Sequence, residues 1–121
     1  MASPQRLTRT ADLLLVRREG KRVRTALLEV RYLASLLHHH RVGIIVPRYK
    51  QTAVARNRLK RRLRELARHT WPAQLAQLAE RSAGTHLDLV LRAAPGAYAA
   101  DFAQLANDVE RLGARLLREA A

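Results

Sequence analysis

The chain has 121 residues, which fits one compact domain, residues 1–121, with a single hydrophobic core. Apolar residues make up 48% of the sequence and cysteine is absent, so a packed core is expected, whereas disulfides, thiol nucleophiles and Cys-ligated zinc are excluded. The formal net charge is +13, and because 18 of the 23 Lys and Arg residues fall within residues 1–70, that part is expected to face a polyanion.

Residues 1–9 are short, polar and basic, and we expect a flexible arm that becomes ordered only against a partner. Residues 10–19 predict a short helix with Thr10 near its N-cap and Gly20 directly after its end. The longest apolar run, residues 13–16, is too short to span a bilayer or to form the core of a signal peptide. We therefore expect a soluble, cytoplasmic protein without a membrane partner.

Two or three strands are expected before residue 50, and two of them are distinct in the sequence. The first spans residues 26–33, where side chains alternate as in a half-buried strand. The side chains of one face are Leu28, Val30 and Tyr32. The second strand spans residues 42–46, which are rich in β-branched side chains and end at a proline. We expect these two strands to pair as a hairpin.

The strongest helical signal covers residues 52–69. One apolar stripe runs along it through four side chains at helical spacing, Ala55, Leu59, Leu63 and Leu66. The opposite face is polar and cationic, with Arg58 and Lys60 to either side of Asn57, Arg61, Arg64 and Arg68. Trp71 and Pro72 are expected to end this helix, with the Trp71 ring covering its end.

The remaining elements alternate between helix and strand. Residues 73–84 predict a further short helix, residues 87–92 a strand and residues 93–98 a turn. Residues 99–119 predict a long amphipathic helix whose apolar face carries Phe102, Leu105, Val109, Leu112 and Leu116. We therefore expect an α+β fold, a single-domain α/β sandwich of a small mixed sheet and three main helices in the order αβββαβα.

The segment with the highest density of charge is residues 48–68, which contain nine basic side chains and one acidic residue, Glu65. Arginine dominates, and its planar guanidinium binds phosphate with two hydrogen bonds or stacks on a base. Glu65 is expected to pair with Arg61 or Arg62, which leaves most of these charges without an intramolecular partner. The segment predicts a nucleic-acid-binding surface rather than a helix face that is merely solvated.

The sequence AVARNRLKRRLRE at residues 53–65 closely resembles the RNR signature of the bacterial ribonuclease P protein subunit family. The resemblance extends over nearly the whole chain. It includes Arg-Leu at residues 6–7 before the first helix, Arg-Val-Gly at residues 41–43, Asp-Leu-Val at residues 88–90 and an Ala-x-Pro-Gly turn before the last helix.

The resemblance implies a protein cofactor of a catalytic RNA that removes the 5′ leader of precursor tRNA by Mg²⁺-dependent hydrolysis of a phosphodiester bond. It implies that the RNA performs the cleavage, so no residue of this chain is expected to be catalytic or to bind a metal, and no organic cofactor is expected. The expected partners are the catalytic RNA, in a 1:1 complex with a monomeric protein, and precursor tRNA. The family fold also implies a left-handed βαβ crossover, against the usual handedness.

The residues implied to bind RNA are Arg56, Asn57, Arg58, Lys60, Arg61 and Arg62, together with the cationic neighbours Arg64 and Arg68. A cleft between the first helix and the sheet is implied to hold the single-stranded leader, with Leu13, Arg17, Leu28, Arg31, Arg48, Tyr49 and Lys50 as candidate contacts. The family usually has aromatic side chains there. Either Arg17 and Arg31 stack on bases instead, or the leader is held mainly through its phosphates. Tyr49 is either a relocated contact or a surface ring.

Two other classes of protein fit the charge pattern. A non-catalytic ribosomal or chaperone-like RNA-binding protein would use the same basic helix, whereas a DNA-binding architectural protein is disfavoured because one monomeric helix lacks the usual dimer geometry. The histidines at residues 38–40 are expected to form a solvated hairpin loop rather than a metal site. The carboxylates of Asp12, Asp88 and Asp101 lie on separate predicted elements, so no nuclease site is expected.

Overall fold

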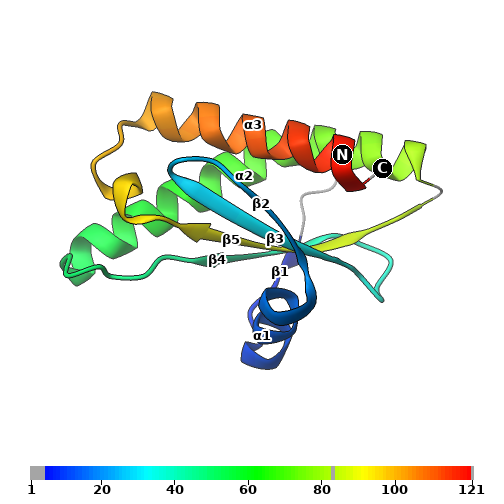
Figure 1. Ribbon diagram of the computed structural model, residues 1–121, viewed down its shortest axis with the longest axis horizontal. Helices are drawn as coiled ribbons and strands as arrows, with labels where there is room; N and C mark the ends of the chain where they lie inside the picture. The colour runs from blue at the N-terminus through cyan, green and yellow to red at the C-terminus, as the bar shows by residue number, and fades with distance from the viewer. Residues whose placement is uncertain (1–4, 83, 121) are drawn as a thin grey trace.

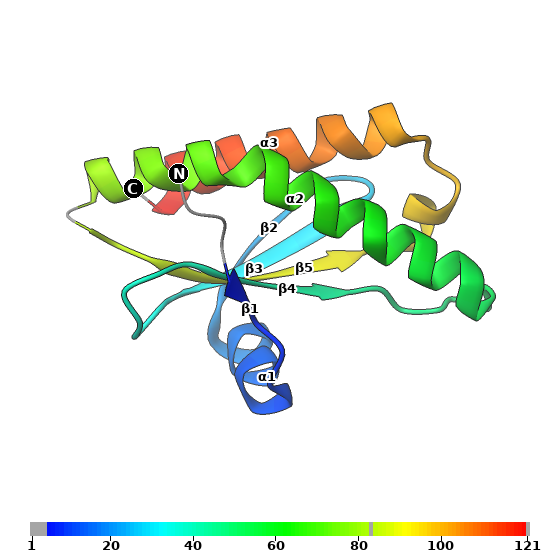
Figure 2. The same ribbon diagram turned by 180° about the vertical axis from the view of Figure 1, so that it is seen from behind.

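A computed structural model describes residues 5–82 and 84–120 (Figure 1). Its strands form one sheet and are β1 (Gln5–Arg6), β2 (Lys21–Arg24), β3 (Leu28–Ala34), β4 (Arg41–Ile45) and β5 (Leu87–Ala93). Its helices are α1 (Thr10–Glu19), α2 (Ala53–Arg81) and α3 (Phe102–Ala120), with a 3₁₀ turn, η1, at Pro95–Tyr98. Figures 1 and 2 show α2 and α3 on one face of the sheet and α1 on the other. The predicted α+β sandwich is confirmed, with the short β1 added before the first helix.

The strands lie in the order β1-β4-β5-β3-β2. β4 runs parallel to both β1 and β5, whereas β3 runs antiparallel to both β5 and β2. The predicted hairpin between residues 26–33 and 42–46 is therefore wrong, because β5 lies between these two strands. The physical reason is burial: Leu89 and Val90, which point to opposite faces of β5, are 0% and 1% exposed. A strand buried on both faces belongs in the middle of a sheet.

The connection from β4 through α2 to β5 joins two neighbouring parallel strands. In Figure 1 both strands run from right to left, β4 lies behind β5, and α2 returns above them. Figure 2 shows the same arrangement from behind. The crossover is therefore left-handed, as the family resemblance implies, and opposite to the hand that nearly all such connections have.

The amino-terminal segment packs against the sheet at residues 5–7, where the chain is not the free arm that the sequence predicts. β1 pairs with the start of β4, and the next residue, Leu7, is only 2% exposed. Leu7 belongs to a small core beneath α1, together with Val16 and Val90. Strand pairing and the burial of Leu7 together hold residues 5–7 against the sheet. Residues 1–4 of the predicted arm lie outside the described residues.

The main core lies between the sheet and the pair α2 and α3. The alternation predicted for β3 is confirmed, because Leu28, Val30 and Tyr32 are buried in this core whereas Glu29 and Arg31 are only half-buried. The stripe of α2 is confirmed in its leucines, which face the same core. Hydrophobic burial on this side of the sheet therefore supplies most of the apolar contact area of the fold.

Helix α2 continues well past its predicted end, so Trp71 and Pro72 do not terminate it. Trp71 is 1% exposed and its Nε1–H donates to the carbonyl of Val109 in α3 at 2.9 Å. The prediction that Trp71 covers a helix end is therefore wrong. The helix predicted within residues 73–84 is the second half of α2, buried against α3 through Leu75 and Leu78. Packing between the two helices outweighs the hydrogen bond that Pro72 cannot donate.

Helix α3 begins with a reciprocal cap. The backbone N–H of Gln104 donates to Oδ1 of Asp101 at 2.8 Å, and the N–H of Asp101 donates to Oε1 of Gln104 at 2.9 Å. The predicted apolar face is confirmed at Leu105, Val109, Leu112 and Leu116. It is wrong at Phe102, which is 53% exposed because it is the first residue of α3 and precedes the first buried one, Leu105.

Replacing Leu63 tests the packing of α2 on the sheet. The side chain is 0% exposed in the main core, so Leu63→Ala is expected to lower the free energy of unfolding by about 2–5 kcal/mol through lost burial and the cavity left behind. Chemical denaturation measures this loss. The matched control is Leu36→Ala, because Leu36 is 98% exposed and its truncation is expected to change stability by less than about 0.5 kcal/mol. Equal stability of the two variants would contradict the packing described here.

Candidate RNA-binding surface

The first half of α2 presents its cations to solvent because its leucines are buried. Leu59, Leu63 and Leu66 are at most 7% exposed. Side chains of an α-helix recur every 3.6 residues, so burial of this stripe determines where the intervening side chains point. We call the eight residues predicted to bind RNA the α2 surface. Asn57, Arg58, Arg61, Arg62 and Arg68 are exposed, and Arg56, Lys60 and Arg64 are half-buried.

Most cations of the α2 surface lack an acidic partner. Within residues 5–82 and 84–120, no Asp or Glu forms an ion pair with Arg58, Arg61 or Arg62. Glu65 pairs instead with Arg68 at 2.8 Å and with His69 at 3.4 Å, so its predicted pairing with Arg61 or Arg62 is wrong. An acid that precedes its basic partner by one turn is the favoured order in a helix. The hydrogen bond from Arg68 lowers the pKa of Glu65 below its ordinary value.

Lys60 lies in the part of the α2 surface that faces the edge of the sheet. Its side chain borders a hollow of about 200 Å³ that Arg6, Leu13 and Arg64 also line. Burial lowers the pKa of Lys60, and the positive charges of Arg56, Arg64 and Arg6 lower it further. The three arginines thus raise the positive potential around this lysine, which is the electrostatic environment that favours a bound phosphate.

Arg56 also has a structural role. Its Nε–H donates to the carbonyl of Val46 at 2.8 Å, which ties the start of α2 to the end of β4. Thr52 caps the helix, because its hydroxyl oxygen accepts from the N–H of Ala55 at 3.1 Å. These two bonds fix where the α2 surface begins relative to the sheet.

The residues predicted to line a leader cleft do not meet in one place. Leu13 lies in the hollow beside Lys60, at the edge formed by β1 and β4. Tyr49 borders another hollow, of about 440 Å³, together with Glu29 and Arg92 on the sheet. Arg48 and Lys50 lie on either side of Tyr49, and both are exposed. Leu28 borders the same hollow as Tyr49, but it is 1% exposed in the main core, so its side chain offers little surface to RNA.

Arg17 and Arg31 do meet, at the end of α1. The Nη1 of Arg31 donates to the carbonyl of Arg17 at 2.6 Å, and its Nε donates to Glu29 at 2.9 Å. Arg31 therefore satisfies a carbonyl at the end of the helix and forms an ion pair, and its guanidinium is less available for stacking on a base. Arg17 is exposed. Of the two arginines, Arg17 is the better placed to contact RNA.

Tyr49 holds the loop before α2 in place. Both Tyr49 and Lys50 have positive φ angles, 46° and 66°, a backbone conformation that residues other than glycine rarely adopt. The Tyr49 hydroxyl donates to the carbonyl of Ala93 at 3.1 Å. Its ring meets that of Tyr98 edge-on, with the ring centroids 6.4 Å apart. These contacts oppose the strain of the loop, so Tyr49 is a structural anchor that also borders the hollow beside Arg92.

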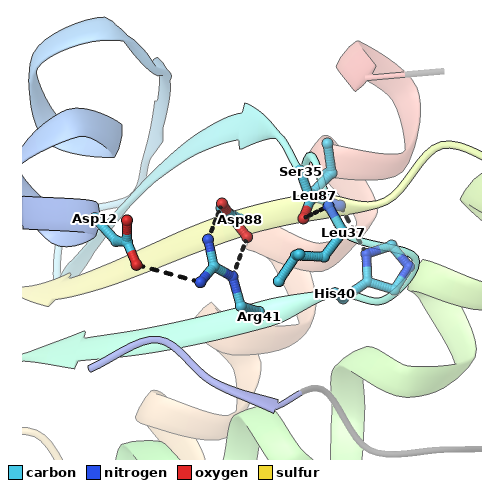
Figure 3. Close-up of polar contacts among 7 residues, drawn as sticks. All are labelled: Asp12, Ser35, Leu37, His40, Arg41, Leu87 and Asp88. Atoms are coloured by element: carbon cyan, nitrogen blue, oxygen red, sulfur yellow. Dashed lines mark hydrogen bonds and ion pairs between the residues drawn. The ribbon is translucent and has the colours of Figure 1, made fainter. Parts of the chain in front are cut away.

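An ion-pair cluster that the sequence patterns do not reveal joins α1 to the sheet (Figure 3). The guanidinium of Arg41 donates to both oxygens of Asp88, at 2.8 and 2.7 Å, and to Asp12 at 3.3 Å. These hydrogen bonds, above all those to Asp88, raise the pKa of Arg41. Arg41 and Asp88 are directly paired in the parallel register of β4 and β5. That register could reveal the pair only after the two strands were known to be neighbours.

The histidines at residues 38–40 do not behave alike. His38 is exposed, whereas Nδ1 of His40 accepts from the N–H of Leu87 at 3.0 Å (Figure 3). The His40 ring packs on His86 with the centroids 4.9 Å apart. The prediction of a solvated loop is therefore wrong for His40. Within the described part of the chain, no group of three or more His, Cys, Asp or Glu residues is placed to hold a metal ion.

An α+β sandwich with an arginine-rich helix surface and few acidic partners has the electrostatic character of a nucleic-acid-binding protein. The ribonuclease P family model matches residues 1–117, and the chain belongs to this family of protein components. It is 38% identical to the ribonuclease P protein component of Acidothermus cellulolyticus over 119 residues, which cover 96% of this chain and 91% of that protein. The corresponding protein of Syntrophobacter fumaroxidans is 39% identical over 93 residues, which cover 77% of this chain and 71% of that one.

Solved structures agree with the fold. The ribonuclease P protein from Thermotoga maritima superposes with a TM-score of 0.68 at 25% identity, covering 92% of this chain and 96% of that one. The Staphylococcus aureus protein superposes with a TM-score of 0.69 at 24% identity, covering 88% and 90%. Among the described residues, no helix is both long enough and apolar enough to cross a bilayer.

Acidification tests the contact made by His40. Burial lowers the pKa of His40 below its ordinary value of 6.5, the charge of His86 lowers it further, and a hydrogen bond to the backbone of Leu75 opposes the shift. The neutral ring therefore contributes stability above pH 6.5, and this stability is lost as the pH falls from 6.5 through the lower pKa of the folded state. Melting temperatures across this range measure the effect. His40→Asn is expected to flatten the profile, whereas His38→Asn is expected to retain it. An identical decline in both variants would contradict the assignment.

Removing charges tests the α2 surface. Arg61→Ala and Arg62→Ala are each expected to weaken RNA binding and to reduce the slope of log affinity against log salt by about 1 for the phosphate contact removed. Neither side chain is buried, so the melting temperature is expected to stay unchanged. Arg56→Ala is expected to lower the melting temperature as well, because it loses the bond to Val46. An unchanged salt slope in the Arg61 and Arg62 variants would show that these arginines do not contact phosphate.

Proposed function

We propose that this chain is the protein subunit of ribonuclease P. It binds the catalytic RNA of that ribonucleoprotein and the 5′ leader of precursor tRNA, and it thereby promotes Mg²⁺-dependent endonucleolytic removal of the leader. The observation that supports this most strongly is the α2 surface, whose exposed arginines mostly lack acidic partners within the described residues of a chain that belongs to this family. A ribosomal or chaperone-like role is not favoured, because the curated relatives are ribonuclease P protein components.

The α2 surface is proposed to hold the catalytic RNA. Its exposed cations lie on a rigid helix, so little conformational entropy is lost when several of them engage phosphates together. Arg58, Arg61 and Arg62 are the first contacts we would assign. Lys60 and Arg64 would hold a phosphate at the hollow near Arg6, where three cations already lie close together. This contact would relieve the repulsion among them.

The leader is proposed to run over the open face of the sheet beside α1. The candidate contacts left by the structure are Arg17 on α1 and Arg48 and Lys50 in the loop before α2. Arg31 and Tyr49 are held by other contacts of the protein. Of the two ways of holding the leader, contact through phosphates therefore has more support than base stacking, and it implies a strong salt dependence of leader binding.

Catalysis is proposed to reside in the RNA. Asp12 and Asp88 come together in the fold, but the Arg41 guanidinium donates to both, so a cation already lies where a metal ion would have to bind them. The Mg²⁺ ions of the reaction are accordingly proposed to act with the RNA subunit. The sheet edges β1 and β2 are short and charged, which opposes pairing between copies and supports a monomer in a 1:1 complex.

Reconstitution tests the proposed function. The chain is combined with a bacterial ribonuclease P RNA at a low Mg²⁺ concentration, and cleavage of precursor tRNA is measured. We expect faster cleavage than with the RNA alone, no cleavage with the protein alone, and weaker binding to mature than to precursor tRNA. The double variant Arg61→Ala/Arg62→Ala serves as the control for the α2 surface and is expected to lose most of the enhancement at moderate salt. Equal binding of precursor and mature tRNA, or no enhancement, would contradict the proposal.

A further inference from the structure

A second group of arginines lies away from the α2 surface, where β2 meets α3. Arg24 is the last residue of the edge strand β2, and Arg111, Arg115 and Arg118 lie on α3. Together they line a shallow groove of about 420 Å³, with Ala114 between them. We call these four residues the α3 arginine cluster. Neither the family motif nor the charge balance of the C-terminal part points to it, because acidic residues elsewhere in that part cancel its charge.

The geometry brings the four cations to one side of α3. Positions 111, 115 and 118 are separated by four and three residues, so they share one face of the helix. Arg115 is held in place, because its Nη1 donates to the carbonyl of Arg24 at 2.7 Å. Arg24, Arg111 and Arg118 are exposed. The cluster therefore combines one fixed guanidinium with three that are open to a ligand.

The acidic groups nearby do not neutralise the cluster. Asp108 is buried and accepts from the Thr25 hydroxyl at 2.6 Å and the Leu27 N–H at 3.3 Å. Its carboxylate thereby joins α3 to the turn after β2. Glu119 approaches Arg115 at 3.7 Å. In the part of the chain that the structure describes, Arg24, Arg111 and Arg118 form no ion pair. Three of the four charges therefore remain available to an anion.

The spacing of the three arginines on α3 lowers the stability of that helix. Like charges three or four residues apart on a helix repel each other, and an acidic residue at one of these positions would have stabilised α3 instead. All four cations are arginines, whose guanidinium forms paired hydrogen bonds with phosphate oxygens. A polyanion with regularly spaced phosphates would offset this repulsion, because each phosphate attracts the arginines beside it.

The cluster and the α2 surface lie on different sides of the molecule. Figure 1 views it from the side of α3 and β2, whereas Figure 2, turned by 180°, views it from the side of α2. In the sheet, β2 forms one edge, and β4, from which α2 continues, lies at the other end with β1. One straight RNA segment bound along α2 therefore does not also cover α3 and β2.

We propose that the α3 arginine cluster is a second RNA-binding site, which engages the phosphates of an RNA segment distinct from the one held by the α2 surface. The protein then bridges two segments of structured RNA. This inference rests on the proposed RNA-binding function but assigns a site that the RNR motif does not include. Two sites that act on one RNA raise the overall affinity, because binding at one raises the effective concentration at the other.

The test uses the full chain and a bacterial ribonuclease P RNA as the probe. Arg111→Gln/Arg118→Gln removes two exposed cations and keeps Arg115. Because each of these cations is expected to bind one phosphate, the slope of log affinity against log salt is expected to fall by about 2, and the affinity near 0.15 M salt by roughly 30-fold. Ala114→Glu places an acid within the cluster, four residues before Arg118, so it is expected to weaken RNA binding. Attraction to Arg118 offsets the repulsion from Glu110, four residues earlier, so α3 is expected to stay folded, which circular dichroism checks. The matched control is Ala103→Glu, the same change at an exposed position in the first turn of α3, which is expected to bind RNA nearly as the parent does.

Footprinting of the RNA distinguishes the two sites. Nucleotides that lose protection in Ala114→Glu are expected to differ from those that lose protection in Arg61→Ala/Arg62→Ala. An unchanged salt slope in Arg111→Gln/Arg118→Gln, equal effects of Ala114→Glu and Ala103→Glu, or loss of protection at the same nucleotides in both sets would overturn the second site. Loss of binding to phosphatidylserine vesicles but not to RNA would assign the cluster to membranes and also overturn it. These measurements report binding alone, so they separate failure of this inference from failure of the proposed role in tRNA cleavage.

Discussion

Burial of the leucine stripe of α2 is the constraint on which the RNA-binding surface depends. Each fully buried leucine contributes about 1.5–3 kcal/mol, whereas repulsion between like charges one turn apart costs only about 0.2–0.5 kcal/mol for each pair. Burial of Leu59, Leu63 and Leu66 therefore determines the rotation of the helix about its axis. Because the helical period is fixed, the same burial directs Arg58, Arg61 and Arg62 away from the sheet.

The two halves of α2 have different tasks. The first half carries the cations, and the second half anchors the helix to α3 through Trp71, whose indole N–H donates to the carbonyl of Val109. The helices also approach closely at Gly113, where a Cβ would displace the end of the Gln74 side chain. This anchoring matters for binding, because a charged helix that moved relative to the sheet would lose conformational entropy on contact with RNA.

Features set by local periodicity could be predicted from the sequence, and features set by contacts between distant segments could not. The stripe of α2, the alternation in β3 and the motif at residues 53–65 each lie on one element, so they were evident. The position of β5 between β3 and β4 depends on which strands pair. Pro72 is a strong local signal for a helix end, but burial of Trp71 and its bond to α3 override it. Among the leader contacts, Arg31 and Tyr49 are likewise held by carbonyls of distant segments, which no pattern in a single sequence records.

The edges of the sheet show why the choice of arginine matters. β1 and β2 are short and exposed, and charged side chains on such edges prevent pairing between copies of the chain. Any charge would serve that purpose, and acidic residues favour solubility more than basic ones do. Yet every charged residue that lines the groove between β2 and α3 is an arginine. Solubility alone does not account for that choice, whereas recognition of phosphate does, since it requires both the positive charge and the planar pair of donors.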